Sequence, residues 1–193
     1  FRLRRAGESV ILMDASHQLE SVPPFILIER HLEQLGFSVP AIHASDAKKG
    51  YLLLEDFGDD TFTRLLQANH DSVSLYTVAV DVLIALHKKA EAIPPGLRAY
   101  HPQKMIEDIE LFLEWRTPGI SDQGRLEFRA AWEQILPLAH QVATSLLLRD
   151  YHVANLMLLS EREGVRQAGL LDFQDAYQGP ITYDLVSLLE DAR

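Results

Sequence analysis

The stretch Leu146–Leu159, LLLRDYHVANLMLL, places a short polar segment between two apolar runs. Apolar runs of this length on either side of a polar break are typical of two strands joined as a hairpin. A hairpin turn, however, needs neither an Arg-Asp pair at its start nor an asparagine at its end. Asp150 and Asn155 stand five residues apart in this break, so the segment is a candidate for chemistry as well as for a turn.

A second motif follows the next apolar run, where Asp172-Phe173-Gln174 ends the segment AGLLDFQ. The catalytic loop of kinases has the form H-R-D-x-x-x-x-N, in which the aspartate accepts the proton of the attacking hydroxyl and the asparagine holds a metal ion. Arg149-Asp150 and Asn155 keep that spacing, and Asp172 stands where kinases have the metal-binding aspartate of D-F-G. A strand, a turn and a second strand would bring Asp172 back beside Asn155. Two oxygen ligands at strand ends suit magnesium.

Composition narrows the function classes. The chain has 193 residues, 47% hydrophobic and 24% charged, with no cysteine and a net charge of −10. The absence of cysteine excludes disulfides and thiolate metal sites and fits a reducing compartment. The negative charge argues against general binding to nucleic acid, although a single nucleotide needs only local dipoles and a metal ion. No apolar run has the roughly 18–20 residues that a membrane-spanning helix requires.

The order of elements predicts a sheet-bearing part followed by a helical part. Periodicity and breakers predict strands in 1–5, 9–15, 39–46 and 50–60, the last with its apolar run at 51–54. They also predict helices over 23–36, 59–69, 72–96, 102–116 and 125–143, and a loop over 117–124. They then predict a hairpin of 145–150 with 155–160, a third strand over 168–173 and a final helix from Tyr183. A natural division falls near residues 57–60, with a cleft between the two parts.

The chain resembles a known family at these motifs. RDYHVANLML and LLDFQDAYQGPITYDLVSLL look like the aminoglycoside phosphotransferase family of small-molecule kinases. VILMDA and YLLLEDFGDD are similar to its sugar-kinase branch, which phosphorylates the anomeric hydroxyl of N-acetylmuramate and N-acetylglucosamine. The resemblance implies an α+β, bilobal, protein-kinase-like fold with a small sheet-bearing N-lobe over 1–57 and a larger, mostly helical C-lobe over 58–193. It also implies ATP as donor, Mg²⁺ as cofactor, a sugar hydroxyl as acceptor and a cytoplasmic setting.

The resemblance assigns roles residue by residue. It implies Asp150 as the catalytic base and Asn155 with Asp172 as the metal ligands. The linker between the lobes would offer backbone groups near Glu55, Asp56 and Phe57 to adenine. The sequence begins as if inside a strand and stops in SLLEDAR as if inside a helix, so both lobes are expected to be truncated.

Other residues have two interpretations each. Glu29 matches the helix glutamate of the small lobe or is an ordinary surface glutamate. Asp175 fits either support of the metal ion or stabilisation of a turn. Asp184 is expected to stabilise a helix start through the helix dipole, and His152 is expected to be solvated or packed in the loop rather than to act as a base.

The sequence departs from the kinase pattern at three points. One is that no glycine-rich phosphate loop precedes FRLRR, which we attribute to the expected truncation of the N-lobe. The other two define the alternatives. Leu148 stands where the catalytic loop usually has histidine, and Met13 stands where the phosphate-binding lysine is expected, which removes a point charge. These departures suggest a pseudokinase or nucleotide-binding module as an alternative to an active sugar kinase. An antibiotic-modifying phosphotransferase is the nearest alternative within the kinase class, and a very acidic pocket would favour it.

Overall fold

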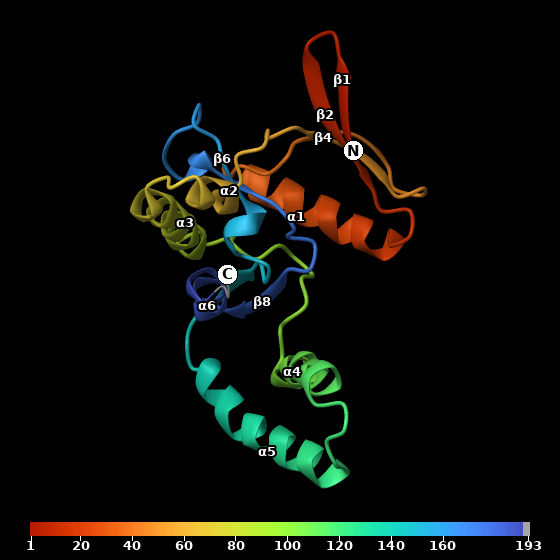
Figure 1. Cartoon of the computed structure of the whole chain (residues 1–193), viewed down its shortest axis with the longest axis vertical. Coiled ribbons are helices and arrows are strands. Elements are labelled where there is room, and N and C mark those ends of the chain that lie inside the picture. Colours follow the sequence, from red (N-terminus) through yellow and green to blue (C-terminus); the bar gives the residue numbers. More distant parts are fainter. Residues whose placement is uncertain (191–193) are drawn as a thin grey trace.

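A computed structural model of the chain describes residues 1–190 (Figure 1). The expected continuation of the last helix to Arg193 lies outside the described residues. The first elements are β1 (Arg2–Arg5), β2 (Glu8–Asp14), the 3-10 helix η1 (Leu19–Ser21), α1 (Val22–Gln34), β3 (Ile42–Asp46) and β4 (Tyr51–Glu55). The four strands form one antiparallel sheet in the order β1-β2-β4-β3. The hairpin predicted at its start is confirmed.

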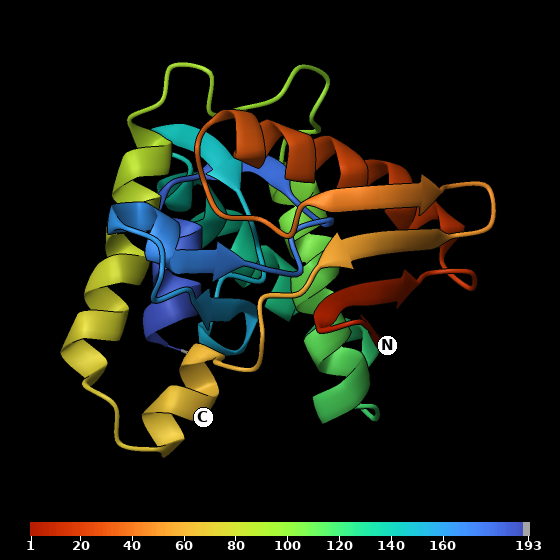
Figure 2. The same cartoon turned by 90° about the horizontal axis from the view of Figure 1, so that it is seen from above.

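Helix α1 lies against this sheet, as Figure 2 shows from above, and its apolar side chains join a core with those of the sheet. The helix has prolines in its first turn, where the missing N–H costs no helical hydrogen bond. It ends before Gly36, whose φ of 89° reverses the chain. Its buried side chains Phe25, Ile28 and Leu32 share one core with Leu52 and Leu54 of β4.

The helical part begins after the linker that follows β4. Its helices are α2 (Phe62–Gln67), α3 (Ser72–His87), α4 (Pro102–Arg116) and α5 (Asp122–Ala139). The helix predicted over 125–143 was misplaced, because α5 begins three residues earlier, at Asp122, and ends four residues earlier, at Ala139. Ser121 caps it by accepting a hydrogen bond from the backbone N–H of Gly124. Helices α4 and α5 extend at the end of the molecule opposite the β1–β2 hairpin (Figure 1).

The last elements correct the predicted pairing of strands. They are β5 (Thr144–Leu147), η2 (Val153–Asn155), β6 (Leu156–Leu158), η3 (Gly164–Gln167), β7 (Ala168–Leu170), β8 (Tyr177–Pro180) and α6 (Thr182–Leu189). The predicted hairpin of 145–150 with 155–160 is wrong, since β5 pairs with β8 and β6 pairs with β7. Gly179 permits the β5–β8 pairing, because a Cβ at that position would stand 2.6 Å from a methyl carbon of Leu147.

One continuous core joins the sheet-bearing part to the helical part. The rings of Phe25 on α1 and Phe173 after β7 stack with centroids 4.9 Å apart. Both belong to a buried cluster that also contains Leu148 and residues of α3. The α+β architecture is therefore as predicted, whereas the exact division at residue 57 stays a prediction. Within residues 1–190, no helix is both long and apolar enough to cross a bilayer.

Candidate active site

The loop between β5 and β6 has an unusual backbone. Arg149 adopts a φ of 70°, a left-handed conformation that is costly for a residue with a side chain. The N–H of Asp150 donates to the carbonyl of Leu148 at 2.9 Å, and the N–H of Asn155 donates to the carbonyl of His152 at 2.9 Å. Strain of this kind persists only where surrounding contacts hold it, and it gathers at functional sites.

The buried carboxylate of Asp184, in the first turn of α6, holds this strained backbone. It accepts the N–H of Leu148 at 2.7 Å and the N–H of Arg149 at 2.9 Å. Burial raises the pKa of Asp184 to about 7, and the two N–H donors oppose that rise. The helix-dipole interpretation of Asp184 therefore missed its principal contacts, which lie on the loop that carries Asp150.

The structure brings Asp172 beside Asn155. The amide nitrogen of Asn155 donates to the backbone carbonyl of Asp150 at 3.0 Å and to Oδ2 of Asp172 at 3.3 Å. The N–H of Leu171 donates to the carbonyl of Asn155 at 3.0 Å, which fixes the two chain segments to each other. Asp172 has a φ of 57° and also accepts from the Gln174 amide at 2.7 Å.

The charges at this point suit a divalent cation. The pKa of Asp150 is raised by burial first and then by the carboxylates of Asp172 and Asp175. Such mutual repulsion is relieved by a positive ion among the carboxylates. The amide nitrogen of Asn155 is engaged by protein acceptors, which leaves its oxygen for a cation, and Asp172 supplies a carboxylate. One amide oxygen and one carboxylate form a set that fits Mg²⁺, an ion that keeps several waters or phosphate oxygens.

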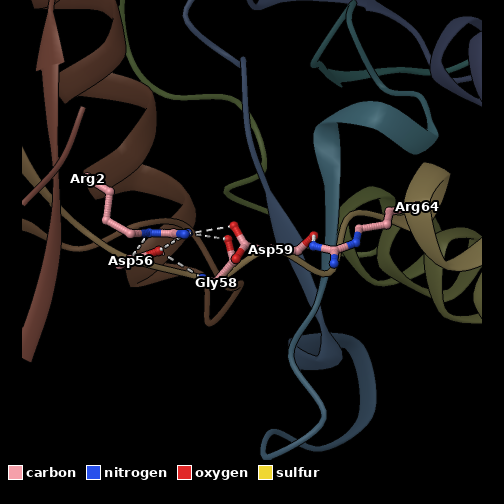
Figure 3. A network of polar contacts seen from close by, with 5 residues as sticks. All are labelled: Arg2, Asp56, Gly58, Asp59 and Arg64. Carbon is pink, nitrogen blue, oxygen red and sulfur yellow. Dashed lines mark hydrogen bonds and ion pairs between the residues drawn. The ribbon is translucent and has the colours of Figure 1, made fainter. Parts of the chain in front are cut away.

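The linker after β4 is held from the sheet side by Arg2 of β1 (Figure 3). The Arg2 guanidinium donates to Asp56 at 2.9 Å, to the carbonyl of Gly58 at 2.8 Å and to Asp59 at 2.8 Å. Arg64 of α2 reaches the carbonyl of Asp59 from the other side at 3.5 Å. The Asp56 side chain therefore makes its hydrogen bonds within the linker and with Arg2.

The neighbouring linker side chains, Glu55 and Phe57, also contact other parts of the protein. Glu55 pairs with Arg162, from the segment between β6 and β7, at 2.5 Å, and that guanidinium lies 5.1 Å from the centroid of the Phe57 ring. The Phe57 ring covers Gly169, where a Cβ would clash at 2.7 Å. Binding of adenine by the backbone near Glu55, Asp56 and Phe57 stays a prediction.

Glu29 lies apart from the loop cluster, buried in α1 with only 2% of its surface exposed. Its carboxylate interacts with the backbone of Ile42, and burial raises its pKa to about 7. Met13 of β2 packs at the edge of the same core, so the position expected to hold a lysine supplies no positive charge. A role for Glu29 in nucleotide binding stays a prediction.

Glu29→Gln should change stability in a pH-dependent way. Because the pKa of Glu29 is about 7 in the folded state and 4.5 as its ordinary value, ionisation opposes folding progressively as pH rises between those values. Glutamine cannot ionise, so the variant should exceed the parent in free energy of unfolding by roughly 3 kcal/mol at pH 8 and match it near pH 4. Urea unfolding at both pH values measures the difference. Glu20→Gln, at an exposed glutamate, is the control, and an equal difference at both pH values would refute this interpretation.

A cavity of about 730 Å³ opens beside the loop between β5 and β6, among α4, α5 and α6. Its wall is mainly apolar and aromatic, with Trp132 and Tyr183 among its members, and His152 of the loop borders it. His152 also stands 3.3 Å from the amide nitrogen of Asn155. A pocket of this size is typical for a small organic ligand, and its position beside the loop that carries Asp150 makes it a candidate acceptor site.

Sequence reasoning missed a polar cluster at this cavity. Asp108 of α4 accepts hydrogen bonds from the Tyr100 hydroxyl and from Lys104, both at 2.7 Å. Arg149 lies 5.6 Å from the centroids of the Tyr100 and Tyr177 rings. The only local signal was the Lys104–Asp108 spacing of four, which ordinarily denotes a surface ion pair.

Comparison with characterised proteins agrees with the fold and the motifs. The chain is 32% identical to the N-acetylmuramate/N-acetylglucosamine kinase of Caulobacter vibrioides, with 100% of the chain and 63% of that protein aligned. The corresponding kinase of Pseudomonas putida is 34% identical over 100% of the chain and 56% of that protein. The chain therefore spans somewhat more than half the length of these relatives.

Solved structures share the fold at much lower identity. The choline kinase LicA of Streptococcus pneumoniae superposes with a TM-score of 0.67 at 14% identity, over 97% of this chain and 63% of that one. A gentamicin complex of APH(2″)-IIa gives a TM-score of 0.62 at 16% identity, over 94% and 63%. The sequence profile of the phosphotransferase enzyme family matches residues 1–193, and the chain belongs to that family.

Proposed function

We propose that this protein transfers the γ-phosphoryl group of ATP to a hydroxyl of an amino sugar of the N-acetylmuramate/N-acetylglucosamine class, at the anomeric position. The observation that carries the proposal is the convergence of Asp150, Asn155 and Asp172 at one end of β6 and β7. The identity to relatives named as kinases of these two sugars supports the acceptor class.

Asp150 would act as the base in this reaction. The acceptor hydroxyl loses its proton to the Asp150 carboxylate while its oxygen bonds to the γ-phosphorus, and the bond from that phosphorus to the bridging oxygen of ADP breaks. The raised pKa of Asp150, caused first by burial and then by Asp172 and Asp175, makes it a stronger base than an exposed aspartate.

Positioning would supply most of the acceleration. Asn155 and Asp172 would hold Mg²⁺, which when bound neutralises charge on the phosphates. Asp184 would keep the backbone at Leu148 and Arg149 in the conformation that presents Asp150. The linker backbone near Glu55, Asp56 and Phe57 would receive adenine.

The cavity beside the loop favours a sugar over a polycationic antibiotic. Its wall is mainly apolar and aromatic, which suits the C–H face and acyl group of an N-acetylated sugar. An aminoglycoside carries several ammonium groups, whereas the described residues supply two carboxylates to this wall, Asp108 and Glu190, and Asp108 is already engaged by Lys104 and Arg149. The antibiotic-modifying alternative therefore has less support from the structure.

The test is a screen of the purified protein with Mg²⁺-ATP against amino sugars, aminoglycosides and choline-like alcohols. We expect ADP release with N-acetylated amino sugars and loss of their reducing end, because a phosphate at the anomeric oxygen prevents ring opening. Retention of the reducing end in a phosphorylated product would overturn the anomeric position. Nucleotide binding without transfer to any compound of the panel would favour the pseudokinase alternative.

A further inference from the structure

Asp108 is a polar group set into the mainly apolar wall of the cavity. Its carboxylate is held from three directions: by the Tyr100 hydroxyl at 2.7 Å, by Lys104 at 2.7 Å and by Arg149 at 3.4 Å. Its side chain is 19% exposed. A carboxylate fixed in this way loses little conformational entropy when a ligand binds, which favours affinity.

The chemistry of this cluster selects the kind of ligand group. An ionised carboxylate only accepts hydrogen bonds, so the ligand must present O–H or N–H donors. Lys104 and Arg149 already offset the charge of Asp108, and a cationic ligand group would meet two positive charges nearby. Uncharged hydroxyl groups satisfy both conditions, because they donate to Asp108 without adding charge.

The cluster is also linked to the residue that precedes the candidate base. The Arg149 guanidinium contacts Asp108 and lies over the rings of Tyr100 and Tyr177. A ligand that is hydrogen-bonded to Asp108 is therefore held at a fixed position relative to the loop that carries Asp150. The aromatic rings of Trp132 and Tyr183 at the same cavity offer surfaces for the apolar face of a sugar ring.

We propose that Asp108 is the specificity-determining residue of the acceptor site and binds non-reacting hydroxyl groups of the sugar ring. This proposal rests on the proposed function for the identity of the reaction, but it concerns binding and can be measured without turnover.

Asp108→Asn is the first test. Asparagine keeps the size of the side chain and can still accept a hydrogen bond from Tyr100 or Lys104. The charge-assisted hydrogen bonds from the sugar hydroxyls to the carboxylate are lost. We expect the KM for the acceptor sugar to rise by about 10- to 100-fold, as for loss of hydrogen bonds to a charged group, with an unchanged KM for ATP. Glu107→Gln is the matched control, since Glu107 adjoins Asp108 and lies 3.9 Å from the same Lys104 nitrogen.

Deoxy analogues of the sugar separate recognition from structural support. The analogue that lacks the hydroxyl bound by Asp108 should have similar KM values on the parent protein and on Asp108→Asn. A structural role would instead raise the KM of every analogue by the same factor, and that outcome would overturn the proposal.

Binding of the sugar without turnover can be measured by the fluorescence of Trp132. The chain has two tryptophans, and Trp115 is 86% exposed and outside the cavity wall, so Trp115→Phe leaves Trp132 as the sole reporter. If the sugar quenches Trp132 fluorescence in the parent and does so more weakly in Asp108→Asn, the proposal is supported. The same result without any ADP release would refute the kinase function. ADP release with unaltered sugar KM and quenching in Asp108→Asn would refute the proposal and leave the kinase function standing.

Discussion

Asp150→Asn is expected to reduce phosphoryl transfer to the accepted sugar by about 10²- to 10⁴-fold, the range of a general base. The substitution keeps the shape of the side chain and removes its capacity to take the acceptor proton. Because Asp150 lies outside the linker and is not assigned as a metal ligand, the affinity for ATP should change little. Steady-state kinetics for the acceptor, together with direct measurement of nucleotide binding, separates these two effects.

A control for charge removal comes from the same protein. Asp81→Asn alters an exposed aspartate on α3 and should leave transfer at the parent rate. Transfer by Asp150→Asn at the rate of the Asp81 variant would mean that the base has been assigned wrongly, even if the protein is a kinase.

Asp184→Ala is expected to lower the free energy of unfolding by about 2–5 kcal/mol, since it leaves one buried and one partly buried N–H group without an acceptor. Those donors belong to Leu148 and Arg149, so the left-handed conformation at Arg149 also loses its support. Phosphoryl transfer should fall together with stability, because Arg149 immediately precedes Asp150 in the chain. Urea unfolding and kcat measured below the unfolding transition provide the two readouts.

A milder change tests the same mechanism if Asp184→Ala fails to fold. Asp184→Asn retains one carbonyl acceptor in place of two carboxylate oxygens and should have an intermediate effect on both quantities. If either variant keeps the kcat of the parent while losing stability, Asp184 supports the fold but does not position the loop.

The local spacing of Asp150 and Asn155, with Asp172 after the next strand, was enough to predict that these side chains come together. A short strand, a turn and a returning strand leave few ways to arrange Asn155 and Asp172, so proximity follows from chain geometry. The roles of the three residues stay proposals, because they depend on ligands and not on the fold.

The strand pairing could not be read from the sequence in the same way. Residues 177–180, YQGP, contain glycine and proline, which normally indicate a turn, yet they form β8 beside β5. The pairing depends on close packing of Leu147 over Gly179, a contact between segments 32 residues apart in sequence. Local propensity does not contain that information.

Asp184 and Asp108 were underestimated for a related reason. Each looks locally like an ordinary helix residue, one near a helix start and one spaced four residues from a lysine. Their principal contacts, with the backbone at 148–149 and with Tyr100 and Arg149, join elements that the sequence separates. Leu148 illustrates the converse, because its burial in the core with Phe173 gives an apolar residue a plausible place at a position where kinases usually have histidine.

The most direct test of the central claim is a crystal structure of the protein with Mn²⁺ and a non-hydrolysable ATP analogue, with the ion located by its anomalous scattering. The account predicts an ion within about 2.0–2.3 Å of the Asn155 amide oxygen and an Asp172 carboxylate oxygen, the range for oxygen ligands of small divalent ions. The triphosphate should reach the ion on the side that Asp150 faces. An ion bound elsewhere, with Asn155 and Asp172 still bonded only to each other and to the protein, would contradict the account.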